Sequence, residues 1–154
     1  MPATSHFDPA TQAYVYKRRV AYHETDALGV VHHSNYIRFF EEARVDWLRS
    51  LGLIEIHHPY GPLTFAVTNV SAKYSRPLRF DDPMAIQVEA RLEGLRITIR
   101  YAIWQESTKT LCCTGDTELV PLTSDMRPAR LPENVRDTFS RVPWSGAWPP
   151  KSLT

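Results

Sequence analysis

The chain contains 154 residues, a length that suits one domain with a single hydrophobic core. Eighteen basic and seventeen acidic side chains leave a formal net charge of +1, so there is no strong field to attract nucleic acid or an anionic membrane. No apolar run approaches the ~20 residues that cross a bilayer, and the start, MPATSHFDPATQAY, lacks the pattern of a signal peptide, so we expect a cytoplasmic protein.

The first predicted element is a strand over residues 14–23, YVYKRRVAYH, which is rich in β-branched and aromatic residues. A loop follows it. The stretch from Tyr22 to Tyr36, YHETDALGVVHHSNY, places three histidines, two acidic residues and two tyrosines in fifteen positions. Such a run is consistent with a catalytic loop, a metal site or a polar connection between a strand and a buried helix.

From residue 36 the apolar residues follow the period of an amphipathic helix. They recur every three or four positions, at Tyr36, Phe40, Ala43, Trp47 and Leu51. Ser34 or Asn35 is expected to cap the start and Gly52 the end, which predicts a helix from 34/36 to 51. At ~1.5 Å per residue this helix spans ~24 Å, enough to be the central helix of the fold.

The chain after residue 62 is predicted to form strands. Residues 84–92, MAIQVEARL, and 95–104, LRITIRYAIW, alternate apolar with other side chains, which is typical of half-buried strands. Gly94 separates them as a hairpin, ESTK forms the next turn, and TLCCTGDTELV is a further strand. An earlier strand, TFAVTNVSAKYS, is ended by Pro77.

These elements predict an α+β fold. One strand, one helix and four antiparallel strands joined by short turns form a meander whose apolar face the long helix must cover. The predicted domain covers residues 14–140, with tails at 1–13 and 141–154, the latter draped over the surface or mobile. Cys112 and Cys113 have no spaced partners for a disulfide framework or a metal site, so we expect them in the core or the sheet.

The loop and the helix carry a resemblance to a known family. The order of elements, the block YHETDALGVVHHSNYIRFFEEARVDWLRSLGL and the later YSRPLRFDDPM resemble the hotdog-fold acyl-CoA thioesterases of the 4-hydroxybenzoyl-CoA thioesterase type, over about residues 14–133. The specific signal is an Asp, two variable positions, and then Gly-Val-Val-His-His-x-Asn-Tyr opening a helix. The resemblance implies a hotdog fold, a long central helix wrapped by an antiparallel sheet of about five strands. It also implies an enzyme that hydrolyses an acyl-CoA thioester to the free acid and coenzyme A without a metal or redox cofactor.

The resemblance assigns the two catalytic groups. Asp26 matches the family's catalytic carboxylate, acting as nucleophile or as general base on water; taken alone, an acid at this position is more often a solvated loop residue or a partner of the helix dipole. The backbone N–H of His33 matches the donor that polarises the thioester carbonyl, where the helix N-terminus adds positive charge. Gly29 allows the tight turn that lets both groups face one substrate.

Further motif residues have two interpretations each. The side chains of His32 and His33 line the acyl pocket or support Asp26, or they only pack the loop. Asn35 contacts the substrate or caps the helix, and Tyr36 lines the pocket or packs the helix.

The residues Tyr22 and Glu24 just before the catalytic carboxylate can orient the loop. The plainer interpretation, which the sequence favours, is a core aromatic for Tyr22 and a solvated acid for Glu24.

The histidines also raise the hypothesis of a metal site. The candidates are His23, His32, His33, His57 and His58. Neither adjacent pair has the i, i+4 spacing of helical ligands, and no Cys or carboxylate set completes a tetrahedral site, so we predict no metal. His57 and His58 are interpreted as loop residues.

Coenzyme A carries phosphates, which arginine or backbone donors bind well. By their positions in the motif, Arg76 and Arg96 are the candidates, although a lone arginine on a strand is more often solvated.

The resemblance further implies a homodimer that joins two sheets, commonly doubled to a homotetramer, with active sites between subunits. Partners other than acyl-CoA and a second copy are not expected: no nucleic acid and no membrane insertion. One rival function is a non-catalytic acyl-CoA-binding or sensing module, which loss of the Asp would mark, and Asp26 is present. Another is a hotdog dehydratase, whose Asp/His pair differs from this block.

Overall fold

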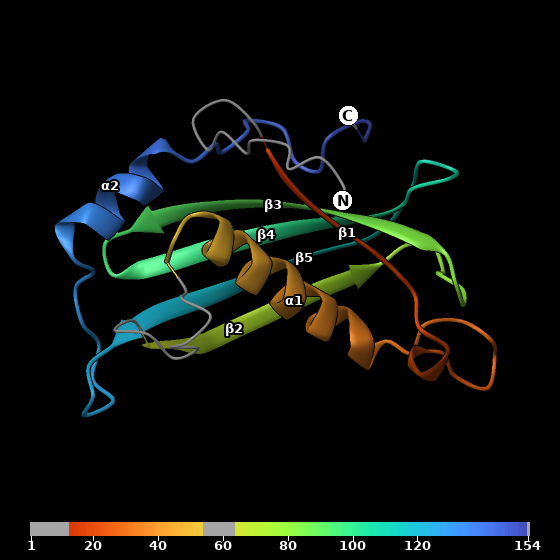
Figure 1. Ribbon diagram of the computed structural model, residues 1–154, viewed down its shortest axis with the longest axis horizontal. Helices are drawn as coiled ribbons and strands as arrows, with labels where there is room; N and C mark the ends of the chain where they lie inside the picture. Colours follow the sequence, from red (N-terminus) through yellow and green to blue (C-terminus); the bar gives the residue numbers. More distant parts are fainter. Residues whose placement is uncertain (1–12, 54–63, 154) are drawn as a thin grey trace.

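The computed structural model describes residues 13–53 and 64–153. His57, His58 and all but the last residue of the predicted 1–13 tail lie outside the described residues. Five strands form one antiparallel sheet, and the helix α1 (Ser34–Ser50) lies across one face of it (Figure 1). The strands are β1 (Tyr14–Arg19), β2 (Thr64–Tyr74), β3 (Pro83–Glu93), β4 (Arg96–Gln105) and β5 (Thr110–Leu122). The predicted α+β architecture is confirmed.

The strand order differs from the predicted four-strand meander. The sheet runs β1-β3-β4-β5-β2, so only β3, β4 and β5 follow one another as neighbours. Strand β3 pairs with β1 on one side and with β4 on the other. Strand β2 pairs with β5, at the opposite edge of the sheet from β1. The chain therefore crosses from one edge of the sheet to the interior between β2 and β3, a path that no short turn makes.

Helix α1 begins and ends close to the predicted positions, but its first cap is different. His33 occupies the N-cap position without a capping bond from its own side chain, and His32 Nδ1 accepts the N–H of Ser34 at 3.2 Å, so the prediction of Ser34 or Asn35 as the cap is wrong. At the other end Gly52 has φ +73°, and the N–H of Leu53 donates to the oxygen of Leu48 at 3.0 Å, as a terminal glycine predicts.

The buried face of α1 fills the core against the sheet. Its buried residues are Asn35, Tyr36, Phe39, Phe40, Ala43, Trp47 and Leu48. The ring of Phe40 stacks on that of Tyr101 in β4, with centroids 4.4 Å apart and planes 10° from parallel. Cys112 and Cys113 are buried in β5, as predicted.

Strand β3 is buried on both faces, whereas the alternation predicted a half-buried strand. On the face away from α1, Gln87 accepts a hydrogen bond from Trp104 Nε1 at 2.7 Å. Glu89 accepts from Arg100 Nη2 at 2.5 Å and from the N–H of Ser145 at 2.8 Å. Glu89 is covered by the C-terminal segment, whose Ser145 contacts its carboxylate.

That C-terminal segment includes a helix the sequence did not predict, α2 (Glu133–Arg141). Val135 and Phe139 are its buried residues, and the Phe139 ring meets Trp47 of α1 at 5.7 Å. Beyond α2, Trp144 and Trp148 lie over the Arg100 guanidinium at 3.7 and 4.5 Å. The predicted C-terminal tail thus contacts the molecule's own sheet through Trp144, Ser145 and Trp148.

Two other boundaries also differ from the sequence prediction. Strand β1 ends at Arg19, and Tyr22–Glu24 form a short 3-10 turn, η1, instead of continuing the strand to residue 23. Leu95, predicted on the apolar face of a strand, lies exposed in the turn made by Gly94 at φ +62°. None of the helices within residues 13–53 and 64–153 has the length and apolar character needed to cross a bilayer.

Candidate active site

The segment between η1 and α1, residues 25–33 and here called the site loop, folds back on itself. Thr25 and Val31 form an isolated antiparallel bridge, and the N–H of Asp26 donates to the oxygen of Val30 at 2.8 Å. The N–H of Gly29 donates to the oxygen of Asp26 at 2.9 Å, and Gly29 has φ +77°. Because side chains other than glycine rarely adopt that angle, the tight turn expected at Gly29 depends on the glycine.

Only one of the two carboxylate oxygens of Asp26 is hydrogen-bonded within the described residues. Its Oδ1 accepts hydrogen bonds from the N–H of Leu28 at 2.8 Å and of Val30 at 3.4 Å. No described residue donates to Oδ2. The turn therefore orients the carboxylate through one oxygen and leaves the other for water or a ligand.

The site loop is also held from the side of the sheet. The N–H of Val31 donates to the oxygen of Leu78 at 2.8 Å, and Val30 bridges Arg79. The loop thus runs beside the segment that follows β2, which brings Asp26 next to residues more than forty positions later.

At the end of the site loop, His33 opens helix α1 with a free donor. Its oxygen accepts a hydrogen bond from the Tyr74 hydroxyl at 3.1 Å and another from the N–H of Tyr36 at 3.4 Å. Within the described part of the chain, the N–H of His33 has no acceptor. The partial positive charge of the seventeen-residue helix adds to this donor.

Asp26 and His33 line one cleft of about 360 Å³. Its walls are formed by Asp26, Val30, Val31, His33, Tyr36, Tyr74, Ser75, Arg76 and Pro77. Of the predicted site residues, Asp26, His33, Tyr36 and Arg76 are brought together here. The rings of Tyr36 and Tyr74 lie 5.1 Å apart, and burial raises the pKa of the Tyr36 hydroxyl above its ordinary value. The raised pKa keeps the Tyr36 hydroxyl protonated further into the alkaline range than an exposed tyrosine.

The other predicted site residues do not line this cleft. Gly29 shapes the turn, and His32 Nδ1 lies 2.8 Å from Ser34 Oγ on the exposed side of the helix start. Asn35 is buried beneath the site loop, only 9% exposed. Arg96 stands at the β3–β4 hairpin with its side chain 58% exposed, 3.7 Å from Glu118. Their roles in substrate binding stay predictions.

Sequence reasoning missed Tyr74 and Ser75 as lining residues. Tyr74 ends β2 and reaches the site because β2 pairs with β5 at the edge of the sheet, in the register Tyr74 to Cys113. The aromatic residue that begins YSRP gives a weak signal, and only the strand order makes it a wall of the cleft. Among residues 13–53 and 64–153, no group of three or more His, Cys, Asp or Glu side chains is placed to hold a metal ion.

A family model for the Thioesterase-like superfamily matches residues 20–139, from just after β1 to within α2. The chain belongs to this superfamily. Among its Thioesterase-like relatives, the acyl-CoA thioesterase YbgC of Haemophilus influenzae is 30% identical over 130 residues, which cover 80% of this chain and 92% of that one.

Solved structures of Thioesterase-like proteins show the same architecture. The DHNA-CoA thioesterase of Staphylococcus aureus superposes with a TM-score of 0.76 at 26% identity, over 83% of this chain and 89% of that one. The 1,4-dihydroxy-2-naphthoyl-CoA thioesterase Slr0204 of Synechocystis superposes with a TM-score of 0.75 over 84% and 96% of the two chains; at 21% identity this shows the fold alone. The predicted hotdog fold and thioesterase family are confirmed, and the chain is a thioester hydrolase by family.

Proposed function

We propose that the protein hydrolyses an acyl-CoA thioester to the free acid and coenzyme A. The observation that carries the proposal is that Asp26 and His33 line one cleft, and that one carboxylate oxygen of Asp26 and the main-chain N–H of His33 have no hydrogen-bond partner among the described residues. The YbgC relative, named as an acyl-CoA thioesterase, supports the same substrate class. The chemistry draws on groups of the chain and involves no metal or redox cofactor.

Asp26 is the group proposed to start the reaction, by one of two routes. As a general base, it removes a proton from water while the water oxygen attacks the acyl carbon; the C–S bond then breaks and coenzyme A leaves as a thiolate that takes up a proton. As a nucleophile, the carboxylate bonds to the acyl carbon, expels coenzyme A and forms a mixed anhydride that water hydrolyses. Either route releases one acid and one thiol and regenerates the carboxylate.

The His33 N–H is proposed to stabilise the charge that develops on the thioester oxygen. A main-chain donor at a helix N-terminus is held in place before the substrate arrives, so it needs little reorganisation when the oxygen becomes negative. The Tyr74 hydroxyl supports this role because it fixes the carbonyl on the other side of residue 33.

Arg76 is proposed to contact the phosphates of coenzyme A from the rim of the cleft, where its side chain is exposed. Tyr36 is proposed to contact the acyl part of the substrate. Gly29, His32 and Asn35 then act through the shape of the site loop, and Arg96 lies at the β3–β4 hairpin and does not line the cleft within one chain.

A second copy of the chain is proposed to close the site. Strand β2 pairs with β5 on one side, and no described strand lies on its other side. Val67 and Tyr74 of β2 and Ile37 of α1 are large exposed apolar residues. A homodimer that joins two sheets at this edge covers them, with a homotetramer as its doubled form. The cytoplasmic location stays a prediction from the sequence.

The proposal is tested by the release of free thiol from short, branched, aromatic and long acyl-CoAs, with sedimentation of the same sample. We expect turnover with at least one acyl class by a dimer or tetramer. Binding of acyl-CoA without thiol release on any member of the panel would favour the non-catalytic binding module. A folded monomer with full turnover would refute the shared site.

A further inference from the structure

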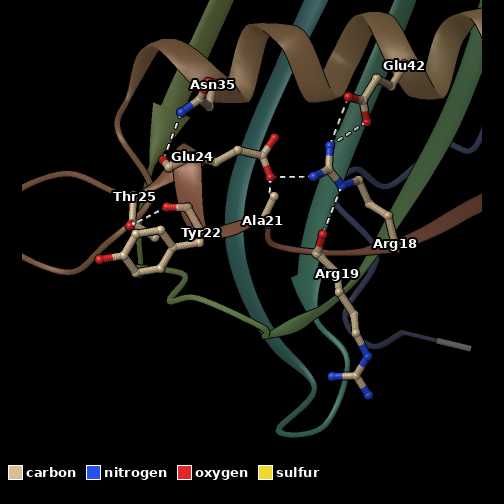
Figure 2. Close-up of polar contacts among 8 residues, drawn as sticks. All are labelled: Arg18, Arg19, Ala21, Tyr22, Glu24, Thr25, Asn35 and Glu42. Atoms are coloured by element: carbon tan, nitrogen blue, oxygen red, sulfur yellow. Dashed lines mark hydrogen bonds and ion pairs between the residues drawn. The ribbon is translucent and has the colours of Figure 1, made fainter.

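Glu24 is a buried acid that the proposed chemistry does not use. Its exposed fraction is 6%, and it lies between strand β1 and the site loop. Its Oε1 accepts a hydrogen bond from the N–H of Ala21 at 2.7 Å and an ion-paired hydrogen bond from Arg18 Nη2 (Figure 2). Removing a carboxylate from water is unfavourable unless donors replace the water, so this arrangement needs both partners.

Arg18 connects this acid to the central helix. Its Nη1 donates to both carboxylate oxygens of Glu42 on α1, at 2.8 and 2.7 Å. Its guanidinium also lies 4.7 Å from the centre of the Phe39 ring, and its Nε donates to the oxygen of Arg19 at 3.1 Å. One guanidinium thereby links β1, η1 and α1, and its side chain is largely buried.

The main-chain oxygen of Glu24 makes a separate set of contacts to the far end of the site loop. It accepts the N–H of His32 at 2.9 Å and the side-chain Nδ2 of Asn35 at 2.8 Å. Figure 2 shows the Asn35 amide directed from the first turn of α1 onto this oxygen. Glu24 is therefore fixed to the body of the protein by its side chain and to the start of the helix by its backbone.

These contacts lie next to both groups of the proposed reaction. Asp26 follows Glu24 by two residues, and His33 follows His32 directly. We infer that Arg18, Glu24, Asn35 and Glu42 form a loop clamp whose Glu24 and Asn35 are positioning residues: they hold the Asp26 carboxylate in place relative to the His33 N–H. This inference rests on the proposed function, and it assigns Asn35 to the support of the loop.

A positioning role has a kinetic signature different from loss of packing. A displacement of about 1 Å between reacting groups is enough to lower a rate ~10²-fold. Because the clamp residues do not line the cleft, releasing the loop should lower kcat while KM stays within about threefold. If the clamp residues had a purely structural role, their loss would lower the melting temperature without lowering kcat selectively over KM.

The test compares Glu24→Ala, Glu24→Gln and Asn35→Ala with a control, Lys17→Ala. Lys17 neighbours Arg18 on β1 and forms an exposed ion pair with Glu106 at 2.7 Å, so its loss removes a charge contact without touching the loop. Gln keeps an oxygen that can accept from Ala21 and Arg18. Asn35→Ala removes one donor to the Glu24 oxygen and leaves the His32 N–H in place.

Two readouts are taken on each folded variant: kcat and KM for acyl-CoA, and hydrogen exchange of the Asp26 and His32 amides. We expect Glu24→Ala and Asn35→Ala to lower kcat by about 10- to 100-fold and to speed exchange at both amides about tenfold or more. Glu24→Gln should recover much of both, and Lys17→Ala should match wild type.

Unchanged kcat in both alanine variants of an active enzyme would overturn the inference, as would a loss of kcat with unchanged exchange in the site loop. If the wild-type protein releases no thiol from any acyl-CoA, the proposed function is wrong. The exchange rates then decide the clamp alone: faster rates in the variants support its hold on the loop, and unchanged rates refute it.

Discussion

The Tyr74 hydroxyl donates a hydrogen bond to the main-chain oxygen of His33 at 3.1 Å, which ties the end of the edge strand β2 to the first turn of α1. The peptide plane after residue 33 is thereby fixed, while the N–H before it has no acceptor among the described residues. Because the carbonyl of residue 33 is bound and its N–H is not, substitutions at this position can test the role of the backbone N–H apart from that of the imidazole.

The first prediction compares His33→Ala with His33→Pro. Alanine keeps the N–H and should retain much of the activity. Proline keeps the carbonyl that Tyr74 binds and fits the observed φ of −55°, but it removes the donor, so turnover should fall ~10²–10³-fold. Steady-state rates are compared after circular dichroism and oligomer size match wild type, since proline also restricts His32. Equal rates for the two variants would rule out the donor role of the N–H. If His33→Ala already abolishes turnover, the imidazole takes part in the chemistry.

The second prediction concerns the contact between helix and sheet. A Cβ on Gly115 of β5 would lie 2.5 Å from Phe40 Cζ and against the main-chain oxygen of Ser71, neither of which has room to move. Gly115→Ala should lower the free energy of unfolding by about 1–3 kcal/mol, measured by urea denaturation. Gly146→Ala is the control, because a Cβ there meets no atom within 4 Å. A Gly115→Ala variant as stable as the control would mean that α1 does not pack this closely on β5.

The third prediction is alkaline destabilisation from buried thiols. Burial, with a smaller contribution from Cys112, raises the pKa of Cys113 from 9.0 to about 12. Above pH 9 the unfolded state loses this proton before the folded state does, so the unfolded state binds fewer protons and the free energy of unfolding falls as pH rises. The stabilisation is complete below about pH 9 and is lost on the way to about pH 12.

Urea denaturation between pH 7 and 10 measures this effect, and a Cys112→Ala/Cys113→Ala variant should show a flatter profile than wild type over the same range. Alkylation of the native protein by iodoacetamide should also be slow compared with the unfolded chain, because the thiolate is the reactive form. Rapid native-state labelling of Cys113 would contradict its burial.

Much of the fold follows from local patterns in the sequence. The helical period from Tyr36 to Leu51 predicted α1, because its buried stripe follows helical spacing. The alternation in residues 84–104 and the glycine at 94 predicted the β3–β4 hairpin, because side chains alternate between the faces of a strand and glycine suits a tight turn. These features depend on residues a few positions apart, and so they are visible in the chain.

The features that were not predicted depend on distant contacts. Helix α2 is short and mostly polar, and it is packed through Phe139 onto Trp47, more than ninety residues earlier. The position of β2 depends on which strand edges remain free once β1 has paired with β3.

Parts of the candidate site also depend on contacts between residues distant in the sequence and so could not be predicted. The motif predicted Asp26 and His33, but the walls supplied by Tyr74 and Ser75 required the strand order. The plainer interpretation of Glu24 as a solvated acid is wrong, because Arg18 from β1 buries it. No sequence pattern identifies Arg18, six positions earlier, as the ion-pair partner of Glu24.

The most direct measurement of the central claim is thiol release by Asp26→Asn beside wild type, on the acyl-CoA that wild type hydrolyses fastest. Asparagine keeps the oxygen that accepts from Leu28 and Val30 and removes the charge, so the turn should persist while turnover falls ~10²–10⁴-fold. Asp125→Asn, the same change on an exposed turn residue, should leave the rate unchanged. Near-wild-type hydrolysis by a correctly folded Asp26→Asn protein would contradict the account.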